Sequence, residues 1–207
     1  MAQLFTDSFD LGGVQIWPEY LSRAAQEVIL AEIRSVAAAA PLQTYQTPGG
    51  HMMSVAMTAA GALGWTADKS GYAYKNTHSG GQAWPAIPPV ILNIWRELTR
   101  SARDPDSCLV NYYGDGARMG LHQDKDEATL DWPVLSISLG DDALFRVGGM
   151  ARRDPTQSAW LRSGDVAVIG GPARLAFHGI DRIKFGSSDL LKSGGRLNLT
   201  LRVAGAD

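Results

Sequence analysis

Apolar residues recur at helical spacing twice in the first half of the chain. Residues 19–40 carry one apolar face with a period of 3.6 residues, and Pro41 ends that pattern. Residues 89–103 carry a second apolar stripe with the same period. The sequence therefore predicts two helices. Their apolar positions are Leu21, Ala25, Val28, Ile29, Ile33 and Val36 in the first, and Val90, Ile91, Ile94, Trp95 and Leu98 in the second.

After residue 106 the pattern changes to short apolar runs separated by Gly, Asp and Pro, which is typical of antiparallel strands. We expect strands at residues 107–113, 133–139, 143–147, 158–161, 165–169, 175–178 and 196–203. Strands at this spacing favour a sandwich, a barrel or a jelly roll. Residues 43–88, rich in Gly, Pro, Tyr and Trp, predict further short strands and loops. The expected fold is mainly β with flanking helices (α+β), in which the helices brace a β core.

Length and composition narrow the class of protein. The 207 residues have room for one domain, and 19 Lys+Arg against 21 Asp+Glu give a net charge of −2. That balance excludes a strongly basic nucleic-acid coat but allows a local basic patch. A single cysteine, Cys108, excludes an internal disulfide framework and a cysteine-based zinc finger. With neither a secretory signal nor an 18-residue apolar run in the sequence, we expect a cytoplasmic protein without membrane contact.

Two of the four histidines stand in positions that suit a metal site. His122 and Asp124 are two residues apart, so in an extended segment their side chains share one face. His178 is the natural third ligand. Two imidazoles and one carboxylate leave three coordination positions open, which is the arrangement of non-heme Fe(II) oxygenases. The alternative is that the His-x-Asp tripeptide arose by chance on a solvated loop.

Leucines alternate strictly with polar residues in the last predicted strand, and the polar residues are Arg196, Asn198, Thr200 and Arg202. One interpretation is an edge strand with a solvated outer face. The other is a polar interior cavity, in which arginines bind a dicarboxylate. Asn111 and Tyr113, also two residues apart, would add an amide and a phenol to that cavity. With the metal site, this second interpretation predicts Fe(II) and 2-oxoglutarate as cofactors, together with O₂.

Several segments resemble the AlkB family of Fe(II)/2-oxoglutarate-dependent dioxygenases, which repair alkylated nucleic acids, and in particular its bacterial branch. The resemblance covers residues from about 40 to the C-terminus. Its most specific part is the H-x-D motif followed by R-x-N-x-x-x-R. The matching segments are 47–50, 53–57, 63–66, 71–72, 111–113, 121–127, 136–140 and 196–202.

The resemblance implies a double-stranded β-helix, or jelly roll, at about residues 106–207 and a nucleotide-recognition lid at about 41–88. Residues 1–40 match weakly and are expected only to brace the core. In this family the ligands of Fe(II) would be His122, Asp124 and His178. Arg196 would bind the distal carboxylate of 2-oxoglutarate. The other residues implied around the cofactor are Asn111, Tyr113, Asn198 and Arg202.

The implied substrate is N-alkylated DNA, with RNA as an alternative, and the implied lesions are 1-methyladenine and 3-methylcytosine. Trp65 would stack on the damaged base, His122 would flank its other face, and Asp126 would lie near its exocyclic amine. Contacts to the phosphate backbone are expected from Tyr72 and the turn at residues 47–50, which includes Thr47. Arg152 and Met53 would add lid contacts. Single strands suit such a site best, and we expect a monomer.

Taken one at a time, these residues have simpler interpretations. Trp65 would be a core residue, Met53 a gap filler, and residues 125–127 a solvated charge run. Two departures from the family pattern are His51, where an aromatic residue is usual, and Ile169, where a Trp is common. Two further hypotheses stay open: a dioxygenase of the same chemistry acting on a protein or small molecule, and a non-enzymatic jelly-roll binding module.

Overall fold

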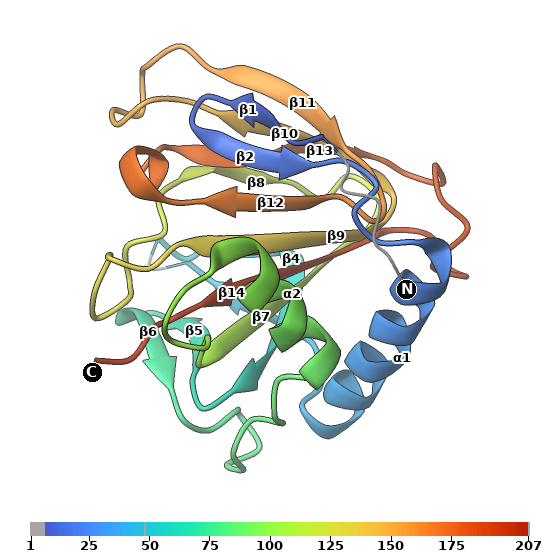
Figure 1. Cartoon of the computed structure of the whole chain (residues 1–207). Coiled ribbons are helices and arrows are strands. Elements are labelled where there is room, and N and C mark those ends of the chain that lie inside the picture. The colour runs from blue at the N-terminus through green and yellow to red at the C-terminus, as the bar shows by residue number, and fades with distance from the viewer. Residues whose placement is uncertain (1–6, 48, 207) are drawn as a thin grey trace.

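The computed structural model describes residues 7–47 and 49–206. Pro48 of the expected phosphate-contacting turn and the start of the N-terminal segment, residues 1–6, lie outside the described residues. Most of the regular secondary structure in the described residues is antiparallel β-structure (Figure 1). Within the described residues, no helix is both long enough and apolar enough to cross a membrane.

Two antiparallel sheets face each other and form the jelly roll that the sequence predicts. The larger has eight strands in the order β1-β2-β12-β9-β14-β7-β4-β3, and the smaller has four in the order β11-β10-β13-β8. The strands of the larger sheet are β1 (Phe9–Leu11), β2 (Val14–Trp17), β3 (Gln43–Gln46), β4 (Met52–Gly61), β7 (Ser107–Tyr113), β9 (Val134–Gly140), β12 (Val166–Ile169) and β14 (Arg196–Arg202). Those of the smaller sheet are β8 (Met119–His122), β10 (Asp142–Val147), β11 (Gln157–Leu161) and β13 (His178–Lys184).

The larger sheet extends beyond the residues expected to form the core. Strands β1 and β2 add to one end of it, and β3 and β4 add to the other through the pairing of β4 with β7. Residues near the N-terminus therefore contribute strands as well as a bracing helix. A separate two-stranded hairpin, β5 (Gly64–Asp68) and β6 (Gly71–Lys75), lies beyond β4 at the lower left of Figure 1.

Both predicted helices form, but each is shorter than predicted. Helix α1 spans Arg23–Ala39, and the Ser22 side chain caps it by accepting a hydrogen bond from the Ala25 amide. It does not begin at Glu19, because that residue has a left-handed φ of 51° and its amide donates to Asp165 Oδ1 at 2.8 Å. Helix α2 spans Pro89–Thr99 and ends where Arg100 turns to a φ of 51°, short of residue 103.

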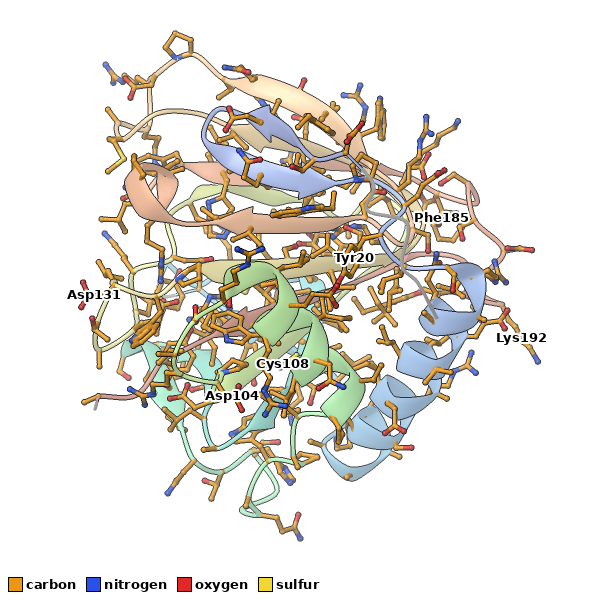
Figure 2. The ribbon with its side chains drawn as sticks, viewed as in Figure 1. Tyr20, Asp104, Cys108, Asp131, Phe185 and Lys192 are labelled. Carbon is orange, nitrogen blue, oxygen red and sulfur yellow. The ribbon has the colours of Figure 1, made fainter. Side chains whose placement is uncertain are left out.

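The outer face of the larger sheet is apolar and packs against the helices. In Figure 1, α2 lies over β14 and β7. Ile91 and Trp95 of α2 share one buried cluster with the β14 leucines and with Cys108, which is labelled in Figure 2. Burial raises the pKa of the Cys108 thiol to about 12, so this free cysteine is an uncharged core residue. This packing fixes one face of β14 and leaves the other for the interior of the jelly roll.

The polar face of β14 is buried inside the molecule. Strand β14 pairs with β7 on one side and β9 on the other, and all seven of its residues are buried. The edge-strand interpretation is therefore wrong, and the polar residues line the space between the two sheets.

The strand predicted at residues 175–178 was placed too early. A short 3₁₀ turn, η1 (Gly171–Ala173), continues through backbone bonds as far as Ala176, and β13 begins only at His178. The apolar run Leu175–Phe177 resembles a strand in sequence, but the backbone follows the turn as far as Ala176. Of these three residues, only Phe177 forms backbone–backbone hydrogen bonds to a neighbouring segment, at Gly148 and Gly149.

Candidate active site

A cavity of about 690 Å³ opens between the two sheets, with the β5–β6 hairpin at its rim. Its lining includes every residue that the sequence singled out for the site. Strands β7, β8, β13 and β14 supply the deep residues, and the loop at residues 123–127 supplies one wall. The lining also contains Tyr74, Arg118, Lys125 and Glu127, which the sequence analysis did not assign to a site.

His122, Asp124 and His178 converge on one point in this cavity. Their candidate ligand atoms all lie within 4.8 Å of one another. His122 Nε2 is 3.7 Å from Asp124 Oδ1, and His178 Nε2 is 3.6 Å from Asp124 Oδ2. His122 ends β8 and pairs directly with His178 at the start of β13, so the sheet register itself brings the two rings together.

Both histidines point the same ring nitrogen into the cavity. Nδ1 of His122 lies 3.0 Å from the Gly120 carbonyl, and Nδ1 of His178 lies 2.9 Å from the Ala176 carbonyl. With Nδ1–H donating to these carbonyls, each Nε2 keeps its lone pair for a metal. Burial and the neighbouring His178 lower the pKa of His122 to about 4, which keeps its ring neutral near pH 7.

A glycine allows the two strands to approach closely at this point. A Cβ on Gly179 would lie only 2.5 Å from the Met119 carbonyl oxygen and 2.8 Å from that of Gly120. The β8–β13 pairing is also irregular between His178 and Ile180. A larger residue at position 179 would push β8, and with it His122, away from His178.

Asp124 is held as a carboxylate by its cationic neighbour. Burial alone would raise its pKa, but the Arg202 guanidinium keeps that pKa well below its ordinary value. Arg202 Nη2 donates to Asp124 Oδ2 at 2.8 Å. Two neutral imidazoles and an ionised carboxylate are the donor set that Fe(II) takes in oxygenases, so these residues fit the metal.

Glu127 and Arg174 form a second layer around Asp124. The side chains of Glu127 and Arg174 are 1% and 7% exposed, and their charged groups lie 3.4 Å apart. Glu127 is also 3.1 Å from Arg202 Nε, and Arg174 donates to the Asp124 main-chain oxygen at 2.6 Å. Nothing in the sequence near Gly171–Ala173 predicts that Arg174 reaches back to residue 124.

Arg196 lies deeper in the cavity, where it has no carboxylate partner within ion-pair distance among the described residues. Its Nη2 donates to Ser138 Oγ at 3.0 Å, and its guanidinium lies 5.3 Å from the Tyr113 ring centroid. Nε and Nη1 are buried without a hydrogen-bond partner. Burial lowers the pKa of Arg196, although Tyr113 opposes that shift. A buried guanidinium with two unsatisfied nitrogens fits an anionic ligand, and the distal carboxylate of 2-oxoglutarate is such a ligand.

The two asparagines expected near the cofactor differ in their partners. Asn111 is buried, and its Oδ1 has no hydrogen-bond partner. Asn198 lies opposite it on β14 but is already engaged: Nδ2 donates to Ser136 Oγ at 2.7 Å, and Oδ1 accepts from Thr200 at 3.0 Å. In this structure Asn111 has more capacity for a ligand than Asn198.

The residues expected to hold a base form a cluster at the cavity rim. Trp65 on β5 stacks on Tyr72 with ring centroids 5.2 Å apart, and Tyr45 meets it edge-on at 6.0 Å. Trp65 Nε1 donates to Asp126 Oδ2 at 2.9 Å, which ties the hairpin to the loop that carries Asp124. Trp65 is half-buried and faces the cavity, so it is not a plain core residue.

The expected lid contacts surround this cluster. Thr47 accepts from the Gly50 and His51 amides in a tight turn, and Met53 is half-buried against the inner core. Arg152 donates to the Leu121 carbonyl at 2.8 Å and lies 5.1 Å from the Phe177 ring centroid. Arg118 and Lys125, both exposed, add positive charge to the lining. The only sequence expectation that pointed toward them was that of a local basic patch.

Comparison with known proteins agrees with this geometry. The family profile described as "2OG-Fe(II) oxygenase superfamily" matches residues 13–202. A jelly roll with two histidines and an aspartate converging beside a buried arginine defines the class of Fe(II)- and 2-oxoglutarate-dependent oxygenases.

Individual relatives narrow the class. The chain is 55% identical over 193 residues to the alpha-ketoglutarate-dependent dioxygenase AlkB homolog of Caulobacter vibrioides, covering 93% of this chain and 88% of that protein. It is 43% identical over 186 residues to AlkB of Escherichia coli, covering 87% and 86% of the two chains. The solved structure of OsALKBH1 is similar at a TM-score of 0.80 and 30% identity, covering 95% of this chain and 99% of that one. The chain belongs to the AlkB family of dioxygenases.

Proposed function

We propose that this protein repairs N-alkylated bases in DNA, with RNA as a second substrate, by oxidative demethylation. Its lesions would be 1-methyladenine and 3-methylcytosine. The reaction consumes O₂ and 2-oxoglutarate and yields the intact base, formaldehyde, succinate and CO₂. The observation that carries the proposal is that one cavity contains both the Fe(II) donor set and an aromatic–acidic cluster suited to a cationic base.

Charge and shape support a methylated base at the rim of this cavity. Both lesions are cations, and an aromatic plane such as Trp65 attracts a cation to its face. Asp126 uses Oδ2 to accept from Trp65, and its other oxygen would accept from the exocyclic amine of the base. A base that cannot pair leaves its stack at low cost, so it would enter between Trp65 and His122.

The deep residues would bind the cofactors. His122, Asp124 and His178 would hold Fe(II), which with 2-oxoglutarate and O₂ supplies the oxidising power to hydroxylate the N-methyl group. Arg196 would bind the distal carboxylate through its unsatisfied nitrogens, with Asn111 and Tyr113 beside it. Asn198 and Arg202 would shape the wall of that pocket while they keep their contacts to Ser136 and Asp124. The buried position of these groups would exclude water from the reaction.

The proposal extends to substrate form and organisation. We assign the lid to residues 41–88 and the catalytic core to 106–207 within one domain, to which residues 7–40 add strands β1 and β2 and a bracing helix. Tyr72, Thr47, Met53 and Arg152 would contact the nucleic-acid strand. Stacking plus a few backbone contacts suffices for a single strand, which we propose as the preferred form. We further propose a monomer that acts in the cytoplasm, where its one thiol stays reduced.

The test is anaerobic reconstitution with Fe(II) and 2-oxoglutarate, followed by O₂ and an oligonucleotide that carries one 3-methylcytosine. Mass spectrometry of the oligonucleotide should show the loss of one CH₂ unit, with formaldehyde and succinate formed in equal amounts. Succinate without that loss would favour a dioxygenase that acts on a protein or small molecule. Neither product from folded, metal-loaded protein would favour a binding module.

A further inference from the structure

A buried cluster of four charged side chains surrounds the candidate metal ligand Asp124. Arg202 and Arg174 carry the positive charges, and Asp124 and Glu127 carry the negative ones. All four side chains are 10% exposed or less. Two of the four, Glu127 and Arg174, touch none of the three candidate ligand atoms and have no role in the proposed chemistry.

Each guanidinium holds a different part of Asp124. Arg202 donates to the carboxylate at 2.8 Å, and Arg174 donates to the main-chain oxygen at 2.6 Å. Arg174 also donates through Nε to the Trp132 carbonyl at 2.7 Å, which fixes it to the far side of the loop. The backbone and the side chain of Asp124 are therefore held independently.

Glu127 joins the two guanidiniums. Its carboxylate lies 3.1 Å from Arg202 Nε and 3.4 Å from Arg174 Nη2, and it accepts a bond from the Tyr74 hydroxyl at 3.3 Å. Burial raises the pKa of Tyr74, so this hydroxyl keeps its proton and acts as a donor. Glu127 is thus held from three elements: β14, the turn after η1, and the β5–β6 hairpin.

The charges around Asp124 would be unbalanced without Glu127. Arg202 lies next to Asp124, and a guanidinium competes with a cation for the same carboxylate. Glu127 pairs with Arg202, which also pairs with Asp124, and it pairs with Arg174 as well. The cluster therefore holds two positive and two negative charges. Without the charge of Glu127, Asp124 would be the only carboxylate for both guanidiniums, and an excess positive charge would face the metal.

We propose that Glu127 and Arg174 are positioning residues, which orient Asp124 and keep its carboxylate available for Fe(II). The inference rests on the proposed Fe(II) site but not on the nature of the substrate. Neighbours of metal ligands commonly change metal affinity about 10- to 100-fold when they are substituted. Glu127→Gln keeps the shape and removes the charge. Arg174→Lys keeps the charge but cannot bind Trp132, Asp124 and Glu127 at once.

The experiment titrates Mn(II) into the metal-free full-length protein, without 2-oxoglutarate or nucleic acid, and follows free Mn(II) by electron paramagnetic resonance. We expect both variants to bind Mn(II) at least about tenfold more weakly than the parent. The matched controls are Glu97→Gln, on the exposed face of α2, and Arg146→Lys, in an ion pair with Asp181 on the smaller sheet. Both controls should bind like the parent.

Thermal melting without metal ensures that only folded protein is compared. If Glu127→Gln does not fold, Arg174→Lys decides, because it leaves Glu127 paired with a cation. Parent-like Mn(II) affinity in the folded variants would overturn the inference. A parent that binds Mn(II) but does not demethylate overturns the proposed function alone. An active parent whose variants bind Mn(II) normally overturns only this inference.

Discussion

The two arginines of β14 lie on the same face of one strand but in opposite electrostatic surroundings. Arg202 is paired with Asp124 at 2.8 Å and Glu127 at 3.1 Å, and its pKa is raised. Arg196 has no such partner among the described residues, and burial lowers its pKa. Two arginines on one face of one strand can therefore have different roles, which are set by the carboxylates beside them. Arg202 completes the protein's own charge cluster, whereas Arg196 has no carboxylate partner among the described residues and would keep its positive charge for the proposed carboxylate ligand.

The largest expected effect comes from removing the carboxylate that Arg202 shares with the metal site. Asp124→Ala should reduce demethylation and succinate formation to background, because one of three metal ligands is lost. The fold should survive, because Arg202 keeps its ion pair with Glu127. Formaldehyde and succinate assays check this, with His78→Ala, outside the cavity lining, as the control. Normal turnover in Asp124→Ala would refute its assignment as a ligand.

The comparison predicts opposite stability effects for the two arginines without ligands. Arg202→Met leaves two buried carboxylates with one guanidinium fewer, which should cost about 3 kcal/mol or more. For a chain of this size, that corresponds to a melting temperature lower by roughly 6–12 °C. Arg196→Met removes a buried charge that has no carboxylate partner, so the melting temperature should stay the same or rise. Equal losses in the two variants, measured by calorimetry, would contradict the comparison.

Arg196, whose loss should not lower the stability of the ligand-free protein, should be needed to bind 2-oxoglutarate. Arg196→Ala should raise the KM for 2-oxoglutarate at least about thirtyfold, since losing one partner of a buried charge pair costs about 2 kcal/mol or more. The steady-state requirement for 2-oxoglutarate at saturating Fe(II) measures this, with Arg182→Ala, an exposed residue of β13, as control. An unchanged KM would place the carboxylate-binding group elsewhere in the cavity.

Sequence patterns predicted which residues line the cavity better than they predicted the limits of the elements. The alternation in β14 and the two-residue spacings of His122/Asp124 and Asn111/Tyr113 are local, and a strand turns such spacing directly into a shared face. His178 was expected as the third ligand from the few histidines in the chain, and the resemblance to the AlkB family implied the same residue. For the same reason the apolar stripe of the second helix was correct. In the first helix Ile29, Ile33 and Val36 are buried as predicted, but Val28 is wrong, because it is 54% exposed, and Leu21 lies before the helix begins.

Contacts between distant segments could not be predicted in this way. The partners of Glu127 lie on three elements far apart in sequence, and charge runs like residues 125–127 usually face solvent. The start of α1 depends on the bond from Glu19 to Asp165, which is 146 residues away. The start of β13 depends on a turn whose apolar residues look like a strand. The first two errors arose where a long-range contact outweighed a local preference, and the third arose where a local turn carried apolar residues.

The smallest expected effect comes from Trp65, at the cavity rim and away from both arginines. Its substitution separates substrate binding from cofactor binding. Trp65→Ala removes the ring that would stack on the base, and loss of one stacked base is worth about 1–3 kcal/mol. The kcat/KM for a methylated oligonucleotide should therefore fall about tenfold, while 2-oxoglutarate consumption without substrate stays at the parent rate. That second rate depends on Arg196 and the metal ligands, which Trp65 does not contact. Parallel assays of oligonucleotide repair and uncoupled succinate formation provide the check, with Trp160→Ala on the outer surface as the control. If both rates fall together, Trp65 supports the structure of the site through its bond to Asp126 rather than the substrate.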